Sequence, residues 1–116
     1  MRFRRSRPTD DDVSRLVTDS RLVTDLQTLV VLLDDDGATH WSRWARQSLA
    51  EIERRDARGL TRLRQGYGGM GSFNDLVLEG DGVEDRRRLN DELDALRDRI
   101  YSSVTTLLLE HRRAQT

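Results

Sequence analysis

Apolar residues recur at helical spacing along most of this chain. Leu16, Val23, Leu26, Val30 and Leu33 fall on one face of a helix, and from Leu89 to Leu107 an apolar residue returns every three or four positions. Such stripes are buried when helices pack together. The pattern therefore predicts a mostly α fold, a small four-helix bundle-like domain with one irregular glycine-rich segment before the last helix.

Turn residues divide the pattern into four predicted helices. The first is expected to start near the aspartates at 10–12 and to end at 34–37, where Gly37 suits a left-handed C-terminal cap. The three aspartates at 34–36 oppose the helix dipole, so this end is expected to fray. A second helix is expected from Thr39, a short third over 56–64, and the last after a loop at 79–82. The stretch 76–78 is ambiguous between a strand and a helical turn.

Two tryptophans lie on the second predicted helix. Trp41 and Trp44 are three positions apart and share a face, where they would form core or a lid over the glycine-rich segment. If exposed, they would form a binding hot spot. On the outer face, Glu51 is expected to pair with Arg55, four positions further on. The rest of the buried face is expected to comprise Ala45, Ser48, Leu49 and Ile52.

Composition narrows the function classes. The 116 residues contain no cysteine and no lysine, and the net charge is −1. We expect one helical domain over 13–116 behind a flexible charged arm over 1–12. Without cysteine there are no disulfides, thiolate metal sites or thiol nucleophiles, and without lysine there is neither a Schiff base nor a P-loop. The exclusive use of arginine is typical of a GC-rich bacterial genome.

The charge balance and the apolar runs bear on location and partners. A chain with almost no net charge has no overall field that attracts nucleic acid, so nucleic-acid binding is not expected. The longest apolar run, residues 29–33, is too short to span a bilayer. The arginines near the start are followed by no apolar signal region. The sequence therefore predicts a cytoplasmic protein without a membrane segment.

The stretch QGYGGMGSFNDLVL, residues 65–78, is the irregular segment. Its glycines satisfy G-x-G-x-x-G, but a dinucleotide site needs a strand before the motif and a helix opening at its end. Two interpretations stay open. In one, the segment is a turn in which Ser72, Asn74 or Asp75 bonds the backbone locally, while Met70, Phe73, Leu76 and Leu78 fill the core. In the other, exposed loop amides, Asn74 and Asp75 contact a ligand or a partner.

The residue spacing does not match a calcium loop, a histidine metal site or a serine nucleophile elbow. The aspartates at 34–36 are consecutive and do not follow the calcium-loop pattern. His40 and His111 have no second ligand at helical spacing, and the surroundings of Ser72 do not form a nucleophile elbow. The sequence therefore predicts no metal site, no cofactor and no catalytic residue.

The motif GGMGSFNDL, preceded by HWSRWARQSLAEIERRDARGLTRL, resembles a family of small bacterial domains of unknown function. Members share a helix containing W-x₂-W, a Gly-Leu step and the signature G-G-M-G-S-[Phe/Leu]-N-D-L. The resemblance spans about residues 20 to 110 and implies no activity. By position, the signature residues are Gly69, Met70, Gly71, Ser72, Asn74 and Asp75.

Three function hypotheses follow. The leading one is a non-enzymatic protein-interaction module, in specific form an immunity- or antitoxin-like protein, that binds through the signature residues with Trp41 and Trp44. The alternative is a small-molecule or nucleotide-binding domain that uses the glycine-rich loop, with Asp75 as the best general-base candidate. The third is a homodimer in which the apolar stripe of the last helix completes a bundle with a second copy.

Overall fold

The computed structural model describes residues 19–68 and 70–115. The described elements are α2 (Ser20–Asp35), α3 (Thr39–Glu53), α4 (Arg58–Gly66), the 3₁₀ turn η1 (Phe73–Asp75) and α5 (Val83–Gln115). Four helices and an irregular segment before α5 confirm the predicted mostly α, bundle-like fold for this part of the chain. The arm expected over 1–12 and the expected start of the first helix lie outside the described residues. The stretch 76–78 is extended and belongs to no strand in the described range.

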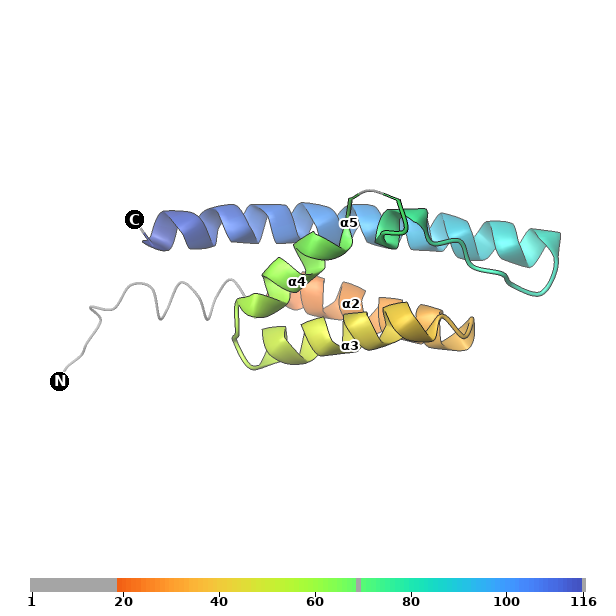
Figure 1. The fold of residues 1–116 in the computed structure, drawn as a ribbon, viewed down its shortest axis with the longest axis horizontal. Coiled ribbons are helices and arrows are strands. Elements are labelled where there is room, and N and C mark those ends of the chain that lie inside the picture. Colours follow the sequence, from red (N-terminus) through yellow and green to blue (C-terminus); the bar gives the residue numbers. More distant parts are fainter. Residues whose placement is uncertain (1–18, 69, 116) are drawn as a thin grey trace.

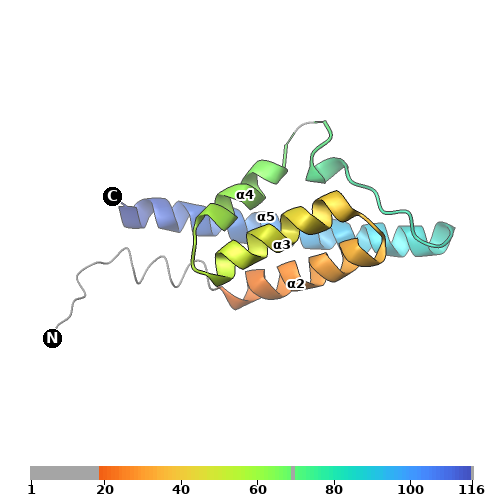
Figure 2. The same ribbon diagram turned by 60° about the horizontal axis from the view of Figure 1, so that its bottom comes forward.

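The longest helix, α5, is the element on which the others assemble. Helices α2 and α3 form an antiparallel pair beside it, and α4 crosses obliquely between α3 and α5 (Figures 1 and 2). Accordingly α2 contacts α3 and α5, and α4 contacts the same two helices. Leucines fill the space between these elements, among them Leu22, Leu26, Leu29, Leu33, Leu60, Leu63, Leu93 and Leu96, all with no exposed surface.

The apolar stripe of α5 is used inside the chain. Leu93, Leu96, Ile100 and Val104 have no exposed surface, because they face the neighbouring helices. These four side chains therefore contribute to the core of the chain itself. In the described range, no helix combines the length and the apolar character needed to cross a membrane.

The C-terminal end of α2 is held by polar contacts instead of fraying as expected. Gly37 has a φ of 74° and ends the helix, as predicted. The Asp34 carboxylate accepts hydrogen bonds from Ser42 and Arg46 of α3, and the bond from Ser42 is the main reason that its pKa lies below the ordinary value. The Asp36 carboxylate accepts from the backbone N–H groups of Glu79 and Gly80, at 2.8 and 2.9 Å.

The extended chain before α5 is held from the other side by Asn90. The Asn90 Oδ1 accepts from the Leu78 N–H at 2.8 Å, and its Nδ2 donates to the Leu78 carbonyl at 2.9 Å. A side-chain amide thus replaces the neighbouring strand that this stretch lacks. The Leu78 side chain is consequently fixed in the core, with no exposed surface.

Candidate functional site

We call residues 66–75, from the last residue of α4 to the end of η1, the glycine loop; its described residues project from the helices (Figure 2). Met70 lies on it with a side chain that is 99% exposed. The prediction that Met70 fills the core is therefore wrong; the apolar residues that follow it, Phe73 and Leu78, reach the core without it. Gly69 lies outside the described residues.

Local hydrogen bonds fix the second half of the glycine loop. The Asp75 carboxylate accepts from the Gly71 N–H at 2.7 Å, and the Ser72 hydroxyl accepts from the Asn74 N–H at 3.2 Å. Gly71 has a φ of 79°, a conformation that side chains rarely adopt. Local bonding of the backbone by Ser72 and Asp75 was one of the predicted alternatives. The Asn74 side chain, by contrast, is exposed and makes no hydrogen bond within the described residues.

Arg97 of α5 holds the base of the loop. Its Nη1 donates to the backbone carbonyls of Phe73, Asn74 and Leu76, at 2.7, 3.2 and 3.0 Å. The side chain is only 12% exposed and also pairs with Asp94. Three carbonyls that converge on one guanidinium fix the path of residues 73–76, because a charged donor strengthens each bond. Sequence reasoning missed Arg97, since α5 carries several arginines and spacing alone does not show which one turns inward.

Aromatic rings pack beneath the loop around Phe73, which has no exposed surface. The ring centroids of Trp41, Trp44 and Tyr67 lie 5.4, 4.7 and 5.5 Å from that of Phe73. The tryptophans are half-buried and lie against the glycine-rich segment, as their spacing predicted. Burial raises the pKa of the Tyr67 phenol, so at neutral pH its hydroxyl is protonated and donates to the Arg97 carbonyl at 3.0 Å.

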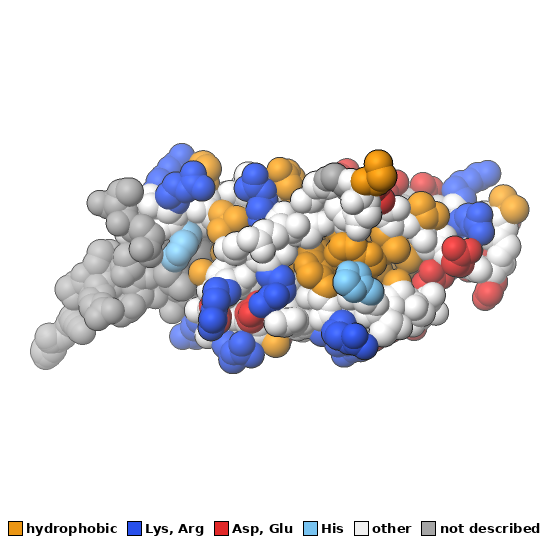
Figure 3. Space-filling model, viewed as in Figure 1, with side chains coloured by type: hydrophobic (Ala, Val, Ile, Leu, Met, Phe, Trp, Pro, Cys, Tyr) orange, Lys and Arg blue, Asp and Glu red, His pale blue; other side chains and the backbone are white. Residues whose placement is uncertain are grey.

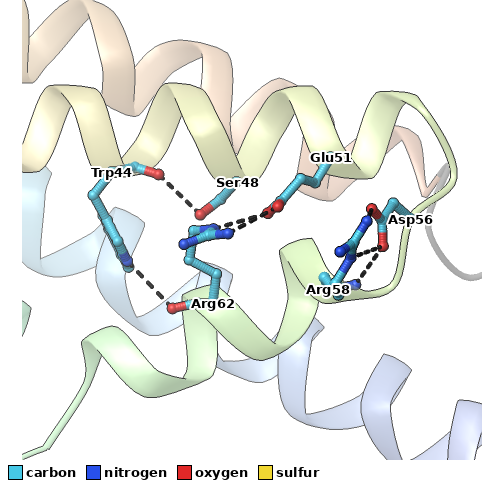
Figure 4. A network of polar contacts seen from close by, with 6 residues as sticks. All are labelled: Trp44, Ser48, Glu51, Asp56, Arg58 and Arg62. Carbon is cyan, nitrogen blue, oxygen red and sulfur yellow. Dashed lines mark hydrogen bonds and ion pairs between the residues drawn. The ribbon is translucent and has the colours of Figure 1, made fainter.

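Helix α3, which carries both tryptophans, is fixed to α4 by the polar network of Figure 4. The Trp44 Nε1 donates to the Arg62 carbonyl at 3.2 Å, and the Arg62 guanidinium donates to both Glu51 carboxylate oxygens at 2.8 Å. Glu51 is buried, so its predicted surface pairing with Arg55 is wrong. Helix α4 packs over this side of α3 and brings Arg62 within reach. The bond from Arg62 holds the Glu51 pKa below its ordinary value.

A groove of about 580 Å³ lies between the glycine loop and α5. We call it the loop groove; it is lined by Arg64, Tyr67, Gly68, Asn74, Arg97, Asp98, Tyr101 and Ser102. A second groove of about 440 Å³ follows the extended chain and the start of α5, and Asn74 also borders it. Asn74 therefore stands between the two hollows that flank the end of the loop.

Neither serine–histidine nor metal chemistry is assembled in the described part of the chain. The Ser72 hydroxyl bonds the Asn74 N–H, whereas His40 lies against Trp41, with ring centroids 4.8 Å apart. No hydrogen bond joins Ser72 to His40 in the described residues. These residues also contain no group of three side chains able to hold a metal ion.

Comparison with known families identifies the segment that contains the glycine loop. Residues 34–86 match the model of a domain of unknown function, DUF6966. The DUF6966 match runs from the end of α2 through α3, α4 and the glycine loop to the first turn of α5. Arg97, which holds the loop from α5, lies beyond it. No curated protein and no solved structure matches the chain.

Proposed function

We propose that this chain is a non-enzymatic protein-interaction module of the bacterial cytoplasm, and that the glycine loop is its binding surface. The observation that carries the proposal is Met70, a large apolar side chain that is 99% exposed on a loop held from below. Methionine is flexible and polarisable, and it is common at surfaces that adapt to a partner. An immunity- or antitoxin-like protein, which covers a single partner, is the specific form of this proposal.

Other apolar side chains are exposed on the segments next to the glycine loop. Val77 is 61% exposed on the chain that leaves η1, and Trp41 is half-buried beneath the loop. Figure 3 shows hydrophobic side chains gathered in the middle of this face, between α3 and the glycine loop. Tryptophan is among the residues that contribute most of the binding energy at interfaces, and exposed apolar patches mark interaction sites.

The way the loop is held favours binding rather than simple chain connection. Arg97 fixes the carbonyls of residues 73, 74 and 76, and Asp75 fixes the Gly71 N–H. A loop already ordered in one conformation loses less entropy when a partner covers it. The hydrogen bonds that fix residues 71–76, together with the exposed Met70, support a recognition role for this part of the loop.

The loop groove favours a second candidate, a domain that binds a small molecule or nucleotide. Its volume of about 580 Å³ is in the range of ligand pockets. Such pockets are lined mainly by apolar side chains, however, whereas charged and polar side chains predominate here. Asp75, the candidate base, already accepts a hydrogen bond from the Gly71 N–H. A thermal-shift screen with nucleotides and sugar phosphates separates the two candidates, because a bound ligand raises the melting temperature.

A pull-down from the lysate of the native host tests the interaction proposal. We compare wild type, Met70→Ser and the control Val31→Ser, which removes a comparable exposed side chain, 59% exposed, from α2. We expect wild type and Val31→Ser to retain one stoichiometric partner, and Met70→Ser to lose it with an unchanged melting curve. A partner retained equally by Met70→Ser, or no partner for wild type, would refute the proposal.

A further inference from the structure

The Asn74 side-chain amide lines the loop groove, and hydrogen bonds hold the Asn74 backbone in place. The Asn74 backbone is held at both ends, because its N–H donates to Ser72 Oγ and its carbonyl accepts from Arg97 Nη1. Its exposed side chain makes no hydrogen bond within the described residues, so both amide N–H groups and the carbonyl oxygen are available. A carboxamide presents a donor beside an acceptor. It can therefore pair with the N–H and C=O of one residue in an extended chain, as the Asn90 amide does with Leu78.

Arg64 supplies a cation to the same groove. It lies in the last turn of α4, and its guanidinium carbon is 5.9 Å from the centroid of the Tyr101 ring. This contact with the ring orients the guanidinium, and no carboxylate of the described residues pairs with it. Guanidinium groups bind carboxylates through two parallel hydrogen bonds.

The other residues that line the loop groove indicate which kind of ligand it can bind. Gly68 forms part of the wall, and a Cβ placed there would meet no atom within 4 Å, so a main chain can approach closely. Arg97 is already occupied by three carbonyls and Asp94. Asp98 is exposed and pairs with no cation of the described residues. Its negative charge would repel a second carboxylate, which places an acidic group toward Arg64 and away from Asp98.

We infer that the loop groove binds an extended segment of the partner protein, with Asn74 pairing with the N–H and C=O of one residue of that segment and Arg64 binding an acidic side chain. A polar groove of this kind suits a peptide main chain, which carries its own donors and acceptors along its length. The inference rests on the proposed interaction function and names the chemistry of the partner that the same loop would recognise.

A random dodecapeptide library displayed on phage, selected on immobilised wild-type protein, tests the inference. We expect the enriched peptides to share an aspartate or glutamate. Binding of the best synthetic peptide, measured by calorimetry, should weaken by about tenfold or more in Asn74→Ala and in Arg64→Gln, since each removes a direct hydrogen-bonding group. Asp98→Asn should bind the peptide more tightly. Gln65→Ala and Arg43→Gln, which remove an exposed amide and an exposed guanidinium elsewhere, should stay within about twofold.

The outcomes separate this inference from the proposed function. No enrichment, enriched peptides without an acidic residue, or equal affinity in Asn74→Ala and Arg64→Gln would overturn the groove as a peptide site. If a partner is then still captured through Met70, the interaction function stands and only its peptide chemistry fails. Melting curves of both groove variants should match wild type, because neither side chain contributes a hydrogen bond to the described fold.

Discussion

Gly66 shows how one residue sets the distance between two helices. It ends α4 directly beside the Trp44 ring, and a Cβ built at this position would lie 2.7 Å from Cε2 of that ring. The ring cannot easily withdraw, because Trp44 donates to the Arg62 carbonyl and packs against Phe73. Glycine at position 66 therefore provides space for the tryptophan.

The substitution Gly66→Ala has two opposing effects on stability, a gain from helix propensity and a loss from overlap with the Trp44 ring. Gly66 has no positive φ, so helix propensity alone would make Gly66→Ala stabilising by up to about 1 kcal/mol. Because the added methyl overlaps Trp44, we expect destabilisation of about 1–3 kcal/mol in urea unfolding. The neighbouring exposed control Gln65→Ala should change stability by less than about 0.5 kcal/mol. A Gly66→Ala variant as stable as wild type would show that Trp44 can turn away without loss.

Helix α5 is both the longest described helix and the support of the glycine loop. Its apolar side packs on α2 and α4, while Arg97, only 12% exposed, reaches the carbonyls of residues 73, 74 and 76. The carbonyls of residues 73, 74 and 76 lie outside the regular hydrogen bonding of the α-helices. These backbone acceptors need partners when they are half-buried, and α5 supplies them through one guanidinium.

Removal of Arg97 should loosen the loop and leave the helices intact. In Arg97→Ala we expect unchanged helical circular dichroism and a loss of about 1.5–3 kcal/mol of stability, since bonds from a charged donor are lost. Hydrogen exchange should accelerate at residues 70–76. The control Arg87→Ala removes an exposed arginine of α5 and should leave exchange in the loop unchanged. Equal exchange in both variants would contradict the role given to Arg97.

The elements could be predicted from the sequence to the extent that they depend on local spacing. The stripe of Leu93, Leu96 and Ile100 required a buried face for α5, and Gly37 marked the end of α2 by its backbone preference. The predictions for Glu51 and Met70 are wrong because the surroundings of both side chains depend on the tertiary structure. Glu51 pairs with a residue of the next helix, and Met70 faces solvent. An i,i+4 rule finds Arg55 but not Arg62 of the next helix, and hydrophobicity alone cannot show that a methionine is displayed outward.

At the scale of the whole molecule, carboxylate side chains form contacts that connect the helices to one another. Asp34 joins α2 to α3, Glu51 joins α3 to α4, and Asp25 pairs with Arg99 to join α2 to α5. Asp36 connects the end of α2 to the chain that leads into α5. The fold therefore depends on side-chain carboxyl contacts at several interfaces, in addition to its leucine core.

Acid should consequently unfold the protein. Hydrogen bonds from Ser42, Arg62, Arg58 and the Asp81 N–H hold the pKa values of Asp34, Glu51, Asp56 and Asp85, respectively, below the ordinary values, with Asp56 at about 2. A lowered native pKa means that the unfolded chain takes up protons first, so stability falls as pH decreases.

Thermal unfolding followed by circular dichroism checks this dependence. We expect a constant melting temperature above about pH 5 and a progressive fall down to about pH 2. In Glu51→Gln the melting temperature at neutral pH should be lower, because the ion pair with Arg62 is lost, and its fall with acid should be shallower. A melting temperature that rises on acidification would contradict this account.

The position of the aromatic rings has a spectroscopic consequence. The chain has two tryptophans, and both Trp41 and Trp44 contact Phe73, the first residue of η1. All tryptophan emission therefore arises beside the base of the glycine loop. Anything that shifts or covers this region changes the intensity or wavelength of that light, whereas an event at the far end of α5 leaves it unaltered. The unmodified protein thus carries its own optical reporter, placed at the surface where we expect it to bind.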